Sequence, residues 1–192
     1  MSINLDRHAS KLIPEILKDS LCQMTHVLKL DEVEAGANVK VLRTAFYTPL
    51  NDVLKITFSE GIEGDELKLE FGFRSGGVGR CWQDHEEVVC DLEDAKTNFS
   101  SAWNMSEYQQ NLVRPQLKSL LCVPIFNLAL FDPRADAPRF NPLVGILTYD
   151  SDLDLLVKFI QKETLDEARI TAGLLSLALR GRLESILSEG NQ

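Results

Sequence analysis

Apolar residues recur at intervals of three and four at both ends of the chain, which predicts a helix at each end. The N-terminal repeat runs over about residues 10–30, where Ser10 is a candidate cap and Pro14 is expected in the first turn. A longer repeat runs over about residues 154–188 near the C-terminus, and its apolar positions are Leu165, Ala168, Ala172, Leu175, Leu179, Leu183 and Ile186. We therefore expect two terminal helices, each with one apolar face.

The middle of the chain, about residues 38–150, has the shorter period that is typical of β-strands. Short helices are expected over Arg80–Asp84 and Ser100–Gln116, and a proline-rich exposed loop over residues 127–142 is either tolerated or has a function of its own. The expected strands are Val39–Phe46 (ended by Pro49), Val53–Phe58, Glu66–Phe73, Val88–Asp91, Lys118–Phe126 and Leu143–Asp150. This order of elements predicts a single α+β domain over residues 1–192, with helices on both faces of one sheet.

Composition narrows the class of protein without naming an activity. The chain has 192 residues, 44% of them hydrophobic and 26% charged, which fits one globular domain. Its formal net charge is −9, so no nucleic-acid partner is expected. No apolar run is long enough to span a bilayer, and residues 1–10 lack the apolar core of a signal peptide. These features predict a protein of the cytoplasm with no membrane partner.

The cysteines and histidines give no metal-binding pattern. Cys22, Cys81, Cys90 and Cys122 are far apart in the sequence, and no histidine stands at a zinc-site spacing from any of them. Thiols of a cytosolic chain stay reduced, so we expect small apolar core residues rather than disulfides. No metal site and no nucleophilic catalytic motif are predicted.

Four segments, in order, resemble the GAF domain family of small-molecule sensory modules. Ser119–Ile125 (SLLCVPI) and Val144–Ser151 (VGILTYDS) resemble its paired central strands. Upstream, Gly77–Trp82 (GVGRCW) and Glu87–Asp91 (EVVCD) resemble its glycine turn, short helix and third-strand pattern. The resemblance implies a six-stranded antiparallel, GAF/PAS-like sheet. Terminal helices would cover one face, and short helices and loops would close a ligand pocket on the other.

Strand alternation then assigns side chains to the two faces. If Leu121, Val123 and Ile125 pack under the terminal helices, as the resemblance implies, then the alternate positions form the floor of the pocket. These positions are Leu120, Cys122, Ile146, Thr148 and Asp150. A small, mostly apolar cavity with one hydroxyl and one carboxylate is a common composition for a small-molecule site.

Other candidate ligand contacts have a structural alternative. Asp150 ends a strand, so it can either contact a ligand or cap the helix that follows. Trp82, Trp103 and Tyr108 are candidates for the lid of the pocket, although each can equally be a core residue. Cys81, which follows the glycine turn, completes the set of expected ligand-binding residues.

Most GAF modules sense ligands, so the resemblance implies a non-catalytic sensor that binds an unidentified small molecule. It would signal through its terminal helices or a homodimer interface to a downstream signalling protein. One alternative is a degenerate scaffold or dimerisation module without a ligand. The other is free methionine-(R)-sulfoxide reductase, which keeps a cysteine where Cys81 stands. In that family the attacking cysteine would fall at Val113, and two recognition carboxylates at Leu120 and Thr148, so this activity is not expected.

Overall fold

The structure is a computed structural model, and it describes residues 9–30, 40–93, 103–127 and 143–189, with side chains of the last helix as far as Leu179. In chain order the elements are α1 (Ala9–Val27), β1 (Arg43–Leu50), β2 (Val53–Glu60), η1 (Gly64–Lys68, a 3₁₀ helix), β3 (Glu70–Gly72), α2 (Gly76–Asp84), β4 (Val88–Asp91), α5 (Glu107–Leu112), β5 (Ser119–Phe126), β6 (Leu143–Ser151), α6 (Leu156–Phe159) and α7 (Lys162–Glu189).

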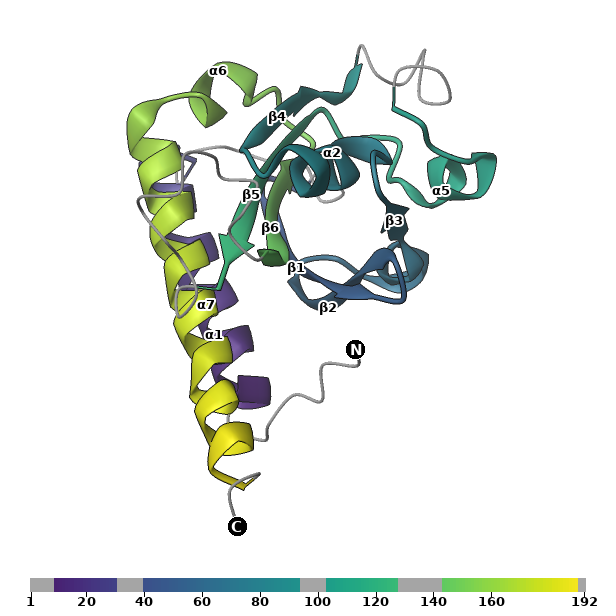
Figure 1. Ribbon diagram of the computed structural model, residues 1–192. Helices are drawn as coiled ribbons and strands as arrows, with labels where there is room; N and C mark the ends of the chain where they lie inside the picture. The colour runs from purple at the N-terminus through teal and green to yellow at the C-terminus, as the bar shows by residue number, and fades with distance from the viewer. Residues whose placement is uncertain (1–8, 31–39, 94–102, 128–142, 190–192) are drawn as a thin grey trace.

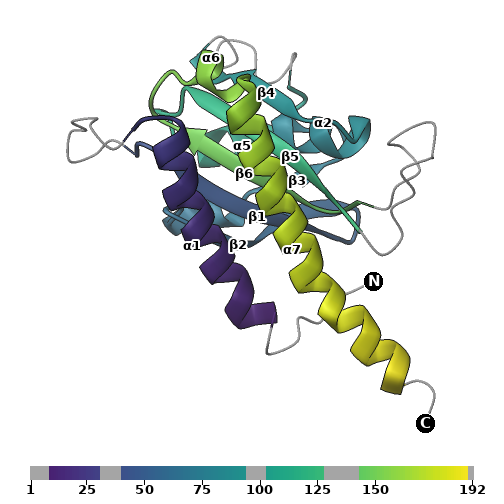
Figure 2. The ribbon, with the colours of Figure 1, turned by 90° about the vertical axis from the view of Figure 1, so that its left-hand side faces the viewer.

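The six strands form one sheet in the order β3-β2-β1-β6-β5-β4, and every neighbouring pair is antiparallel. Helices α1 and α7 lie side by side on one face (Figures 1 and 2). Helix α2 and the short helix α5 lie on the other side of the sheet (Figure 1). The predicted six-stranded antiparallel sheet between a terminal-helix layer and a layer of short helices is confirmed.

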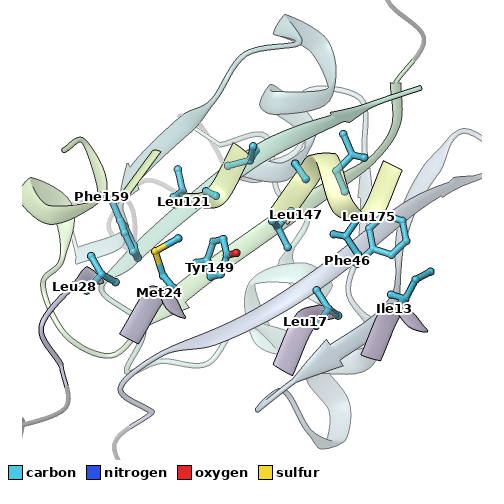
Figure 3. Close-up of a cluster of buried hydrophobic side chains, with 14 of the residues drawn as sticks. Ile13, Leu17, Met24, Leu28, Phe46, Leu121, Leu147, Tyr149, Phe159 and Leu175 are labelled. Carbon is cyan, nitrogen blue, oxygen red and sulfur yellow. The ribbon is translucent and has the colours of Figure 1, made fainter. Parts of the chain in front are cut away.

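Strand alternation divides the buried side chains into two cores, one on each face of the sheet. Leu121, Leu147 and Tyr149 of the sheet belong to the core under α1 and α7. Met24 of α1 and Leu175 of α7 are part of the same core (Figure 3). Cys122 and Ile146 belong to the second core, on the face that α2 covers. The predicted assignment of alternate positions to the two faces is therefore confirmed.

A chain of hydroxyl groups connects α1, β6 and α7 inside the first core. Tyr149 is fully buried, and its hydroxyl forms a hydrogen bond with the Ser20 hydroxyl of α1. Thr171 of α7 donates a hydrogen bond to Ser20 Oγ at 2.9 Å. Burial raises the pKa of Tyr149 to about 12, so its phenol stays protonated as a donor at neutral pH.

Replacing Tyr149 by phenylalanine is expected to lower the free energy of unfolding by about 1 kcal/mol, the net value of a buried hydrogen bond. Urea denaturation measures the change. Tyr47→Phe is the control, because the Tyr47 hydroxyl has no hydrogen-bond partner within the described residues. The control is not expected to lose stability, because it removes a hydroxyl that makes no hydrogen bond there. Equal losses in the two variants would contradict the contribution of the Tyr149 hydroxyl.

Two predicted strands begin several residues before the strands of the structure. The first three residues of the expected strand Glu66–Phe73 belong instead to η1, because Gly64 adopts a φ of +66° and starts a turn, and only Glu70–Gly72 pairs with β2. Pro49 does not end β1, which continues to Leu50. The last β1 residue paired with β6 is Tyr47, so no hydrogen bond to β6 is needed from the position of Pro49.

The predicted helices also need correction. Helix α1 begins at Ala9, which places Pro14 inside the helix rather than in its first turn. The C-terminal helix is interrupted near residue 160, and the short helix α6 brings Phe159 into the core under the terminal helices. The helix expected over Ser100–Gln116 is observed only as α5. Residues 100–102 of that prediction, and the predicted loop apart from residue 127, lie outside the described residues.

Within the described ranges, none of the helices combines the length and the apolar character that crossing a bilayer requires.

Candidate functional site

A cavity of about 60 Å³ lies between the sheet and the layer formed by η1, α2 and the segment that leads through α5 to β5. Leu120, Thr148 and Asp150 of the sheet line it, as do Met105 and Leu117 of the segment before β5. An engineered apolar cavity of about 150 Å³ holds benzene in a well-studied protein. The present cavity therefore accepts a group of only a few heavy atoms unless its walls move.

Glycines allow α2 to lie close enough to the sheet to form one wall of the cavity. A Cβ on Gly77 would lie 2.8 Å from Cys90 Sγ, and a Cβ on Gly79 would lie 2.3 Å from the carbonyl oxygen of Gly72. Both distances are shorter than van der Waals contact allows. The glycine-rich sequence before the predicted short helix thus has a packing role.

Three charged side chains form the polar end of the cavity. Arg43 on β1 lies opposite Asp150 on β6, and its Nε donates to Asp150 Oδ1 at 2.5 Å. Its Nη1 donates to Glu66 Oε2, on η1, at 2.7 Å. The Arg43 side chain is only 2% exposed, and that of Glu66 is 17% exposed. The ion pairs therefore connect the sheet to η1 at the polar end of the cavity.

Burial controls the protonation of these groups. Loss of solvent raises the pKa of Asp150, and the positive charge of Arg43 only partly opposes that effect. Burial alone would lower the pKa of Arg43, but the two carboxylates outweigh it and keep the guanidinium protonated. Burial, followed by the charge of Asp150, raises the pKa of Tyr47, which lines the same cavity. The Tyr47 phenol is therefore neutral at physiological pH.

The structure brings half of the eight predicted ligand-binding residues to the cavity. Those that line it are Trp103, Leu120, Thr148 and Asp150. The alternative in which Asp150 caps a helix is wrong, because this carboxylate pairs with Arg43, while Asp154 accepts a hydrogen bond from the Leu156 N–H at the start of α6.

The other predicted aromatic residues lie elsewhere. Trp82 packs edge-to-face against Phe73, outside the cavity lining. Tyr108 is 61% exposed on α5 and lines a separate open groove beside Lys68. By contrast, Trp103 lies at the cavity with the guanidinium of Arg80 4.4 Å from its ring centroid.

The two predicted cysteines, Cys81 on α2 and Cys122 on β5, belong with Cys90 of β4 to the core between α2 and the sheet, and they do not line the cavity. The sulfur atoms of Cys90 and Cys122 both lie within 3.4 Å of the position of a Cβ on Gly77. Burial raises the pKa of Cys90 to about 12, and it also raises the pKa of Cys81 and Cys122. The three thiols are therefore protonated and weakly nucleophilic at neutral pH. No group of side chains in the described part of the chain is arranged to hold a metal ion.

Sequence reasoning missed Arg43, Tyr47 and Glu66. One signal for Arg43 was present, because an arginine inside an apolar strand must be paired when it is buried. Glu66 was assigned to the wrong type of element, since the expected strand is replaced by η1 at this position.

No known family model matches the chain, and no curated protein sequence matches it. Solved structures do match. The GAF domain of a phosphoenolpyruvate-protein phosphotransferase from Acinetobacter is 14% identical with a TM-score of 0.52, and the match covers 98% of this chain and 100% of that chain. The GAF domain of a two-component sensor histidine kinase from Bacillus halodurans is 18% identical with a TM-score of 0.52, and the match covers 88% and 97% of the two chains.

A free methionine-R-sulfoxide reductase from Neisseria meningitidis, in complex with its substrate, is 16% identical with a TM-score of 0.53, and the match covers 96% of this chain and 98% of that chain. These likenesses establish a GAF-like fold, as the resemblance implied. They contradict the expectation that the chain is not an enzyme, because the same fold serves reductases as well as sensor domains.

Proposed function

We propose that this chain is a ligand-binding domain that takes a small molecule into the cavity beneath α2 and η1 and transmits its occupancy to α1 and α7. The observation that carries the proposal is a charged cluster buried at one end of an otherwise apolar cavity. An apolar cavity with a few fixed polar groups is typical of small-molecule pockets.

Strand β6 supports the second half of the proposal, because it contributes to both faces of the sheet. Thr148 and Asp150 line the cavity, whereas Tyr149 between them forms a hydrogen bond with Ser20 of α1. A ligand that displaces β6 would therefore act directly on the contact between the sheet and the terminal helices.

Thermal melts against a panel of nucleotides, amino acids and tetrapyrroles test the proposal. A ligand that binds only the folded chain, at one hundred times its Kd, is expected to raise the Tm by about 5–10 °C. Val113→Phe should remove that increase, because Val113 lines the cavity and a larger side chain would fill it. Leu174→Phe is the matched control on the outer surface of α7, where Leu174 is 48% exposed. Equal increases in both variants would place the ligand elsewhere, and no increase with any compound would contradict the proposal.

A second candidate function is reduction of free methionine-R-sulfoxide, the activity of one protein with this fold. The cluster of Cys81, Cys90 and Cys122 behind Gly77 favours it, because two thiols can supply the two electrons that convert a sulfoxide to a sulfide, yielding a disulfide and water. Protonated, buried thiols oppose it. Loss of methionine-R-sulfoxide in the presence of dithiothreitol, compared between the wild type and Cys90→Ser, tests this activity. No turnover by the wild type would reject it.

A further inference from the structure

The polar end of the cavity carries more negative than positive charge. Asp150 and Glu66 are both bound to the single guanidinium of Arg43. With both carboxyl groups ionised, as their ion pairs with Arg43 favour, they and the guanidinium have a net charge of −1. The guanidinium of Arg80 lies against the ring of Trp103, but Arg80 is not among the residues that line the cavity. The cavity lining therefore contains one negative charge that no lining group balances.

Three oxygen atoms at this end have no partner within the described residues. Arg43 binds one oxygen of each carboxylate, which leaves Asp150 Oδ2 and Glu66 Oε1 without a hydrogen bond there. The Tyr47 hydroxyl also has no such partner, although Tyr47 is only 5% exposed and lines the cavity. All three residues line the same cavity, and Arg43 joins the two carboxylates.

An unbalanced charge in an apolar cavity selects the charge of what enters it. An anion would be repelled by the excess carboxylate, and a neutral molecule would leave that carboxylate uncompensated. A primary ammonium group has three N–H donors and one positive charge, so it can satisfy all three oxygens and neutralise the site. The aromatic rings of Tyr47, Phe71 and Trp103 in the lining also favour a cation.

We propose that the ligand of this cavity is a small organic cation, a primary amine in its ammonium form with a short apolar body. The ammonium group would contact Glu66, Asp150 and Tyr47, and the body would lie against Leu69, Val78 and Leu120. The proposal rests on the proposed function of the cavity. The cavity volume limits the body to a few carbon atoms unless the walls move.

Three molecules of similar shape and different charge provide the test: n-butylammonium, n-butanol and butyrate. Each is titrated at pH 7.5 into ¹⁵N-labelled protein, and the amide signals of residues 148–150 report binding. Charged hydrogen bonds predict that n-butylammonium binds about tenfold or more tightly than n-butanol. Butyrate is expected to cause no change.

Glu66→Gln is the diagnostic variant, because it removes the excess charge while keeping a side chain of the same shape. It should weaken the binding of n-butylammonium about tenfold or more and leave the affinity for n-butanol unchanged. Asp65→Asn is the matched control, since Asp65 lies next to Glu66 on η1 but is exposed and paired with Lys68. The control should leave both affinities unchanged. If Glu66→Gln fails to fold, Tyr47→Phe tests the same site and should weaken n-butylammonium alone.

The outcomes separate the two proposals. Tighter binding of n-butanol or butyrate at residues 148–150 would overturn the ammonium proposal and leave ligand binding in the cavity intact. An equal response of Glu66→Gln and Asp65→Asn would also overturn it. If none of the three molecules and no member of the thermal-melt panel binds, both proposals fail.

Discussion

Arg43→Met is expected to lower the free energy of unfolding by about 3–5 kcal/mol, because it leaves a buried carboxylate without its ionic partner. Arg43 and Asp150 are directly opposite in the sheet, and neither side chain has more than about a tenth of its surface exposed. Urea denaturation at pH 7.5 measures the loss.

The pH dependence of this loss identifies its cause. Burial already raises the pKa of Asp150, and removing the positive charge of Arg43 raises it further. A carboxyl group whose pKa rises on folding is stabilising when protonated and destabilising once pH exceeds that pKa. The difference in the free energy of unfolding between the wild type and Arg43→Met should therefore become smaller as the pH is lowered from 7.5 toward 5.

Lys55→Met is the matched control for Arg43→Met. Lys55 pairs with Glu70, and both side chains are more than a third exposed. Lys55→Met should therefore change the free energy of unfolding by no more than about 0.5 kcal/mol at either pH. A loss for Arg43→Met that is small, or that grows on acidification, would show that the ion pair is not the source of its stability.

Gly79→Ala is expected to destabilise the fold by about 1–3 kcal/mol or more, since the added methyl group would meet backbone that cannot move independently. Its Cβ would lie 2.3 Å from the carbonyl oxygen of Gly72 and 3.1 Å from backbone atoms of Arg74. Relief requires α2 to move away from β3, which would also open the cavity wall. Thermal and urea denaturation measure the destabilisation.

Gly173→Ala provides the opposite expectation for the same chemical change. Gly173 lies in α7, and nothing lies within 4 Å of its Cβ position. Alanine is the better helix former, so this variant should be neutral or more stable by up to about 1 kcal/mol. Similar effects of the two substitutions would mean that helix propensity, rather than the close approach of α2 to β3, decides the stability of this layer.

The sequence predicts the layers of this fold well because alternation is a local signal. A strand buried on both faces, such as Ser119–Phe126, needs no knowledge of its partners to be recognised as one. The same alternation places Leu120, Thr148 and Asp150 on the cavity side. Once the order of strands is given, these positions follow from geometry alone.

The polar end of the site depends on contacts that are distant in sequence. Arg43 and Asp150 are 107 residues apart, and Glu66 reaches Arg43 from a 3₁₀ helix where a strand was expected. Nothing in the local pattern indicates which carboxylates an arginine in a strand will meet. The prediction that Tyr108 lies at the lid of the pocket was also wrong. No local pattern shows whether a partly apolar helix faces a cavity or solvent.

The hydroxyl chain of Ser20, Tyr149 and Thr171 limits how the two terminal helices can move. A slide of α7 along its axis by one turn, about 5.4 Å, would separate Thr171 from Ser20 and leave buried hydroxyls without partners, at roughly 1–3 kcal/mol for each group. A change in the angle between α1 and α7 about this point keeps the hydrogen bonds. We therefore expect α7 to pivot rather than to act as a piston, and distances between spin labels on the two helices would distinguish the two motions.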